Sequence, residues 1–153
     1  MIKMEGLKAK LYQSCMDFIL QRINTAETAL QQAQEASNDD TKSSAGDKFE
    51  TTREMMQQDI ARNKGLLLDA RQNLALLSSL EEAVQGDTAK NGSLVYTSNG
   101  IFYISISVGQ LKIDEQQIFA ISAVSPIGQL LTGKKAGESF SFNKNEYTIQ
   151  RID

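Results

Sequence analysis

Apolar residues recur at helical spacing through the first part of the chain. Between about residues 7 and 36 the steps are fours and then alternating fours and threes, the repeat of a coiled-coil seam. The positions on this stripe are Leu7, Leu11, Cys15, Ile19, Ile23, Ala26, Leu30 and Ala33. No proline interrupts the segment. The pattern predicts one long helix of about 45 Å, at about 1.5 Å per residue.

A second stripe with the same repeat follows. Its positions are Phe49, Met56, Ile60, Asn63, Leu67, Ala70, Leu74 and Leu77. Ser44 and Asp47 resemble a capping box, so we expect this helix to begin near Ser44 or Ala45 and to end around Ala83. Asn63 is a polar residue on the stripe, as is typical of a residue that fixes register.

The two stripes have similar lengths and a polar connection of about ten residues, which predicts an antiparallel coiled-coil hairpin. Half of a larger bundle and a dimerising coiled coil are the alternatives. The connection, residues 37–50, is acidic: it carries Asp39, Asp40, Asp47 and Glu50. Taken alone, such acids are typical of a solvated loop with helix N-terminal charges. A hairpin of this length would place them at its far end.

The hydrophobic period changes to two after a polar linker at residues 85–93. This alternation predicts strands at 93–97, 101–108, 118–124, 138–142 and 146–152, with a polar loop at 110–115. Ser125 and Pro126 fit the N-cap and first position of a short helix over 127–132. The expected class is α+β: a helical hairpin, residues 1–84 with its tip near 37–47, followed by a small antiparallel sheet domain with one short helix, residues 85–153.

Composition narrows the chemistry. The chain has 153 residues, a net charge of −3, one cysteine and no histidine. These counts exclude an internal disulfide, His-based zinc sites and His acid–base catalysis. The first residues lack an apolar core of signal-peptide length, and no apolar run is long enough to cross a bilayer. We therefore expect a cytoplasmic protein without a membrane partner.

A motif near the C-terminus adds a resemblance. Residues 121–128 read I-S-A-V-S-P-I-G, residues 130–138 read L-L-x-G-K-K-x-G-E, and residues 147–149 read Y-T-I. These segments, together with the order of a helical hairpin before a small sheet domain, resemble the bacterial Gre transcript-cleavage factors, GreA and GreB. The resemblance implies an FKBP-like fold for the sheet domain.

The resemblance also implies a function, which is transcription elongation regulation through RNA polymerase and not catalysis by the isolated chain. Such factors bind the polymerase at the rim of its secondary channel through the C-terminal domain, here through Ser125, Pro126 and Ile127. Nucleic acid would be contacted only within the transcription complex. A monomer is expected.

In this family the coiled coil enters the channel, and acids at its tip help to hold a second Mg²⁺ and its water, which cleaves a backtracked transcript. The candidates in this chain are Asp39, Asp40 and Asp47. Carboxylates suit Mg²⁺, and a two-metal centre stabilises both the attacking and the leaving oxygen. The implied cofactor is only this Mg²⁺, shared with the polymerase; few fixed ligands at a tip would not hold a metal stably in the isolated protein.

The tip departs from the family pattern, which is close to G-D-L-x-E-N-A-E-Y. Asp40 matches the Asp, but Ser43 and Ser44 stand where the Glu and the Asn are expected, and extra residues precede Phe49, the counterpart of the Tyr. Two readings therefore stay open: a factor that stimulates cleavage, and one that occupies the channel without stimulating it. Outside this class, an FKBP-like prolyl isomerase or chaperone and a plain coiled-coil interaction module are the alternatives.

Overall fold

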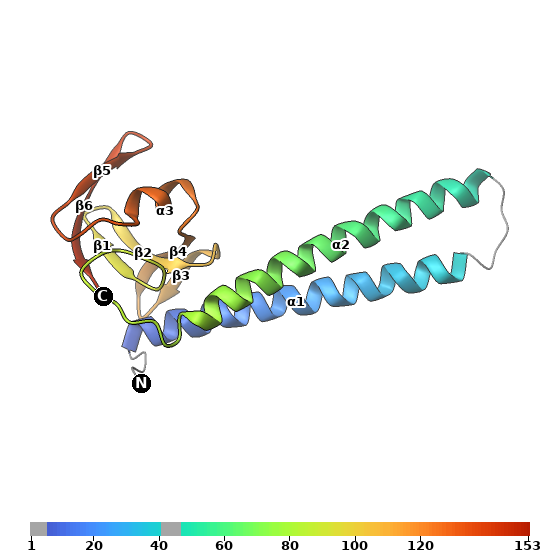
Figure 1. Cartoon of the computed structure of the whole chain (residues 1–153), viewed down its shortest axis with the longest axis horizontal. Coiled ribbons are helices and arrows are strands. Elements are labelled where there is room, and N and C mark those ends of the chain that lie inside the picture. Colours follow the sequence, from blue (N-terminus) through green and yellow to red (C-terminus); the bar gives the residue numbers. More distant parts are fainter. Residues whose placement is uncertain (1–5, 41–46) are drawn as a thin grey trace. The chain divides into compact units, whose positions relative to one another are not determined.

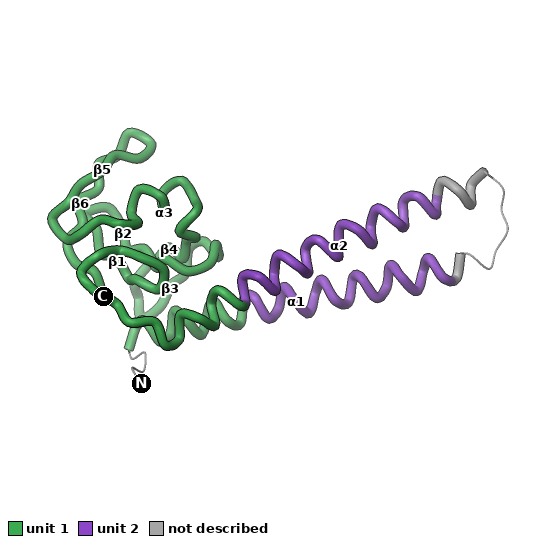
Figure 2. The backbone as a smooth tube through the Cα atoms, viewed as in Figure 1, with its two compact units in different colours: residues 1–18, 75–153 green, residues 19–74 purple. Residues whose placement is uncertain are grey.

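The structure is a computed structural model that describes the backbone of residues 6–40 and 47–153, and the side chains of residues 6–38 and 52–153. Two long helices come first, α1 (Gly6–Asp40) and α2 (Asp47–Ser79), and a sheet follows (Figure 1). The chain forms two compact units, Ile19–Leu74 and Met1–Phe18 with Ala75–Asp153 (Figure 2). The division into two domains at residue 85 stays a prediction.

The Ile19–Leu74 unit is a pair of packed antiparallel helices, as the two stripes predicted (Figure 1). The stripe residues Ala26, Leu67 and Ala70 are buried between the helices. The guanidinium of Arg71 lies 3.4 Å from the carboxylate of Glu27 and joins the two helices at their surface. Alanines at the contact let two helices approach closely, so the packing follows directly from the sequence pattern.

The helix boundaries differ from the prediction. Helix α1 continues to Asp40, and α2 ends at Ser79, earlier than expected. Helix α2 is described from Asp47, and the predicted start near Ser44 or Ala45 lies outside the described residues. After Ser79 the chain continues in turns, in which the N–H of Leu80 donates to the carbonyl of Leu77. Leu80 is buried, so its apolar character belongs to this turn and not to a further helical turn.

Among the described residues, six strands form one sheet with the order β3-β4-β2-β1-β6-β5. The strands are β1 (Leu94–Thr97), β2 (Gly100–Ser105), β3 (Gly109–Ile113), β4 (Gln116–Ser122), β5 (Ser139–Phe142) and β6 (Asn145–Ile152); the short helix α3 (Pro126–Leu131) follows β4. The α+β class is confirmed. The sheet is mixed, however, because β2 and β4 run parallel while the other neighbours are antiparallel. The prediction of a purely antiparallel sheet was wrong.

The segment predicted as a polar loop, 110–115, is largely strand β3. It lies at the edge of the sheet and pairs with β4, with Gln110 and Lys112 exposed and Leu111 and Ile113 half-buried. An edge strand needs little apolar surface, and an outward lysine discourages pairing with other chains. This hairpin also explains the parallel pair, since β3 folds back on the outer side of β4 and leaves its inner edge to β2.

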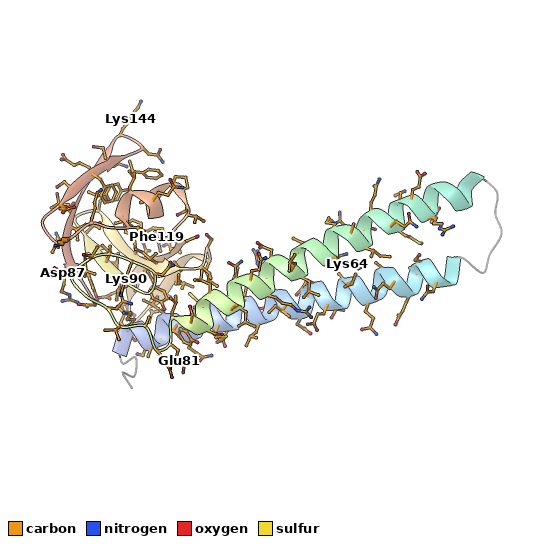
Figure 3. All side chains as sticks on the ribbon, in the orientation of Figure 1. Lys64, Glu81, Asp87, Lys90, Phe119 and Lys144 are labelled. Atoms are coloured by element: carbon orange, nitrogen blue, oxygen red, sulfur yellow. The ribbon has the colours of Figure 1, made fainter. Side chains whose placement is uncertain are left out.

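Strand β2 is buried on both faces because it lies inside the sheet and both faces are covered. Phe102 and Ile104 point to the face that carries α3, while Tyr103 and Ser105 point to the opposite face. Partly buried residues such as Phe119 pack against the first face (Figure 3). The buried residues of this core are Ala89, Val95, Phe102, Ile104, Leu131, Phe140, Tyr147 and Ile149.

Candidate functional site

The predicted polymerase-binding residues lie in the loop from β4 into α3. Ser125 is the N-cap of α3 with an extended backbone, φ −67° and ψ 160°. Its Oγ accepts a hydrogen bond from the N–H of Gly128 at 3.2 Å and donates one to the carbonyl oxygen of Ser122 at 2.6 Å. Pro126 occupies the first helical turn. The predicted start of the helix is therefore confirmed, with the proline where its missing N–H costs nothing.

Val124, which the sequence analysis did not single out, is the most exposed large apolar residue of this loop, with 78% of its surface accessible. Its backbone is fixed on both sides. The N–H of Val124 donates to Ser122 Oγ at 3.2 Å, and its carbonyl accepts from Gln129 Nε2 at 2.8 Å. The loop thus holds an apolar side chain toward solvent on a backbone with few free hydrogen-bonding groups.

Gly128 allows the loop to close on the helix. It is buried, and a Cβ at this position would overlap the carbonyl oxygen of Ser122 and approach Ser125 Oγ to 2.9 Å. The overlap is with backbone, so it cannot be relieved by rotating a side chain. A glycine is required here because the helix backbone approaches the carbonyl oxygen of Ser122 too closely for a side chain.

The three predicted residues have different environments. Ser125 is half-buried and bonded to the loop, Ile127 is half-buried against the core, and Pro126 is exposed. The surface of this loop that a partner could contact is thus formed by Pro126 together with Val124. We call these two residues the loop patch.

Two lysines lie in the turn after α3. Lys134 Nζ lies 6.0 Å from the centre of the Phe140 ring, and Lys135 Nζ lies 3.7 Å from the carboxylate of Asp87. The carbonyl of Lys134 accepts from the N–H of Ala89, which ties the linker to the turn. Both lysines therefore make contacts within the sheet unit.

The predicted catalytic acids fall at the connection between the long helices. Asp39 and Asp40 are the last two residues of α1, and Asp47 is the first residue of α2. Their side chains, and all of residues 41–46 with Ser43 and Ser44, lie outside the described part of the structure. The backbone therefore brings the acids to the ends of adjoining helices, and their mutual geometry stays a prediction.

In the part of the chain that the structure describes, no group of three or more His, Cys, Asp or Glu side chains could hold a metal ion. Neither of the long helices, as far as they are described, combines the length and apolar character needed to cross a membrane. No protein-family model matches the chain, and no curated protein matches it. The likeness to Gre factors accordingly depends on the motif residues and on the order of the elements.

Proposed function

We propose that the chain is a Gre-like regulator of transcription elongation that binds bacterial RNA polymerase at its secondary channel. The observation that carries the proposal is the segment 121–128, in which the motif residues build a capped, hydrogen-bonded loop that exposes Val124 and Pro126. An FKBP-like fold for the sheet domain, a cytoplasmic location and a monomeric state belong to the same proposal.

The loop patch is suited to docking because its shape is set before a partner arrives. Hydrogen bonds from Ser122, Ser125 and Gln129 hold the loop, so binding would order few additional groups. A preorganised surface loses little conformational entropy on association, and exposed apolar side chains gain free energy when water is removed from them. Two small apolar side chains supply only part of an interface, so further contacts must come from elsewhere on the chain.

Within the proposal, Asp39, Asp40 and Asp47 act at the end of the helical hairpin. Inside the polymerase they would supply carboxylate oxygens to a Mg²⁺ that the polymerase also ligates, which suits an ion that usually keeps several waters. Such a metal would activate the water that cleaves the transcript. Ser43 and Ser44, which replace an acid and an amide, keep the second reading open, which is occupancy of the channel without cleavage.

A binding experiment tests the location of the function. Tagged protein and purified bacterial RNA polymerase are mixed at low salt and recovered on the tag, with Val124→Ser and Pro126→Ala as variants. Val84→Ser is the matched control, because Val84 is also an exposed valine, with 60% of its surface accessible. We expect the polymerase to be recovered with wild type and Val84→Ser, and less with the loop-patch variants. Absence of polymerase with wild type would refute the proposal and favour a plain coiled-coil module.

A second experiment tests the chemistry. Stalled, backtracked transcription complexes are incubated with wild type, Asp40→Asn, Asp39→Asn or Asp47→Asn, and transcript lengths are compared. Glu54→Gln is the control, since Glu54 is an exposed acid of α2 beyond the tip. Faster cleavage that is lost in a tip variant but kept in Glu54→Gln supports cleavage stimulation. Binding without faster cleavage leaves the channel-occupying regulator.

The isomerase alternative receives no support from the aromatic residues of the sheet unit. Phe102 and Phe119 stack at 5.7 Å between ring centres, and Phe140 and Tyr147 at 5.0 Å. Phe102, Phe140 and Tyr147 are buried members of the core. These three buried rings are not available to line a proline pocket. We expect no acceleration of prolyl isomerisation in a peptide assay.

A further inference from the structure

A buried polar group lies on the sheet face opposite α3. Tyr103 of β2 is fully buried, and its hydroxyl has no hydrogen-bond partner among the residues that the structure describes. Buried polar groups are nearly always bonded, and an unbonded one carries its full desolvation penalty. The penalty would vanish in any state in which water reaches the hydroxyl.

Helix α1 contacts the same face of β2 through Cys15. Cys15 Sγ lies 3.7 Å from Ser105 Oγ, and both residues are fully buried. Ser105 lies two residues after Tyr103 on the same strand face. Burial first, and then the neighbouring Cys15 and Tyr12, raise the pKa of the Tyr103 phenol. The tyrosine, the serine and the cysteine therefore meet where α1 packs on the sheet.

This part of α1 also has a buried apolar residue, and it makes polar contacts at its surface. Leu11 is fully buried. Lys10 Nζ lies 2.8 Å from both carboxylate oxygens of Asp114, and Lys8 Nζ donates to the carbonyl oxygen of Asp153 at 3.2 Å. Exposed ion pairs of this kind contribute little to stability, so the packing depends mainly on the buried apolar contacts.

We propose that residues 6–18 of α1 open from the sheet as a unit while the rest of the fold persists, and that the Tyr103 hydroxyl promotes this opening because it gains a water partner only in the open state. Opening exposes Cys15, which is shielded when the segment is closed. Parts of a fold commonly open in this way below the global unfolding transition. The device does not depend on binding to RNA polymerase.

Cys15 reports the opening because it is the single cysteine of the chain. Burial raises the pKa of its thiol to about 11, so the closed state is both shielded and poor in the reactive thiolate. The rate of reaction with a disulfide reagent, 5,5′-dithiobis(2-nitrobenzoate), is measured at about pH 8 in increasing urea below the unfolding transition. We expect a rate that hardly changes at low urea and rises steeply only near global unfolding.

The variant that tests the cause is Tyr103→Phe, which keeps the ring and removes the hydroxyl. It should lower the rate at low urea by about tenfold, the change that follows from removing a typical unpaired hydroxyl from the closed state. Lys10→Ala should raise that rate by less than about fivefold, because it removes only an exposed ion pair. Tyr147→Phe is the control: its ring belongs to the core on the other face, and the low-urea rate should not change.

Two results would overturn the proposal. In the first, the rate rises steeply with urea from the lowest concentrations, which means that Cys15 is exposed only by global unfolding. In the second, Tyr103→Phe reacts at the wild-type rate at low urea, which means that the hydroxyl does not control the opening. Circular dichroism and the urea midpoint of each variant establish that the fold is intact, and the Lys10→Ala result remains informative if Tyr103→Phe fails to fold.

Discussion

The hydroxyl of Ser125 donates a 2.6 Å hydrogen bond to the carbonyl oxygen of Ser122, three residues earlier in the chain. The Ser125 hydroxyl oxygen also accepts a hydrogen bond from the N–H of Gly128 at 3.2 Å. One side chain therefore closes the loop after β4 and caps the helix that follows. Because α3 has only six residues, its first turn makes up more than half of the helix, and the cap at Ser125 therefore affects most of it.

Replacing Ser125 by alanine should destabilise the sheet unit. The change leaves the N–H of Gly128 without its partner and frees the loop from Ser122, and loss of an N-cap typically costs about 1 kcal/mol. Urea unfolding followed by circular dichroism measures the change. Ser107→Ala serves as the control, because Ser107 is exposed and should shift the free energy of unfolding by less than about 0.5 kcal/mol. Equal effects of the two variants would contradict the capping role.

Gly128→Ala should cost more than Ser125→Ala. The new methyl group would overlap the carbonyl oxygen of Ser122, so the loop or the helix must move, at a cost of about 2–3 kcal/mol. Gly65→Ala is the matched control: Gly65 lies inside α2, and a Cβ there would meet no atom within 4 Å. That variant should gain about 0.5–1 kcal/mol from helix propensity. Relative to wild type, we expect the urea midpoint to fall for Gly128→Ala and to rise for Gly65→Ala. A lower midpoint for both variants would contradict the prediction.

The contrast between Ser125 and Gly128 shows how far the sequence could lead. A serine followed by a proline before an apolar turn predicts a helix start, because the capping interactions are local. The requirement for Gly128 arises from the carbonyl of Ser122 in the preceding strand, whose position depends on the sheet. The exposure of Val124 likewise depends on how the loop closes. The capping of the helix could be predicted from neighbouring residues, whereas the close approach to Ser122 and the exposure of Val124 depend on the folded sheet.

The strands of the sheet could also be predicted only in part. The helical stripes and most strands follow from periodicity, since each is a property of neighbouring residues. Strand β3 was missed because an edge strand needs few apolar residues, and because its turn uses Asp114 and Glu115, both with positive φ, in place of an Asn-Gly pair. The parallel pairing of β2 with β4 joins segments separated by β3, so no local pattern could indicate it. The sequence indicated Asp39, Asp40 and Asp47 by their charge, but their side chains are not among those that the structure describes.

Asn63 was predicted to fix the register of the helix pair. Its side chain is nearly buried, and its Nδ2 donates to the carbonyl of Asp59 in the same helix at 2.9 Å. Since the described side chains show no hydrogen bond from Asn63 to α1, Asn63→Leu should raise the free energy of unfolding by about 1 kcal/mol through added apolar burial. Thermal unfolding checks the direction of the change, and light scattering during size-exclusion chromatography detects any new oligomer.

Asn24→Leu is the control for the Asn63 variant, because Asn24 is exposed on α1 and a leucine there should not stabilise the fold. If Asn63→Leu unfolds at a lower temperature than wild type, the asparagine has a stabilising role beyond its own helix. If the variant forms oligomers that wild type does not, the predicted role in specifying the pairing of the helices is supported.

The buried thiol of Cys15 makes stability depend on pH in the alkaline range. Burial raises the pKa of the thiol from 9.0 to about 11. Above the ordinary pKa the unfolded chain releases this proton while the folded chain keeps it, so alkali favours the unfolded state. The stabilisation is complete below about pH 9 and is lost as pH rises toward about 11, which amounts to about 2–3 kcal/mol.

Cys15→Ala removes this titration and leaves the lysines and tyrosines in place, so the difference between wild type and variant isolates the thiol. At neutral pH wild type should be the more stable of the two, because the alanine leaves a small cavity beside Ser105. The gap in unfolding free energy should narrow by about 2 kcal/mol when the pH reaches about 10.5. Urea unfolding of both proteins at a series of pH values measures it. A gap that stays constant from neutral to alkaline pH would show that the thiol ionises equally in both states and is therefore accessible in the folded protein.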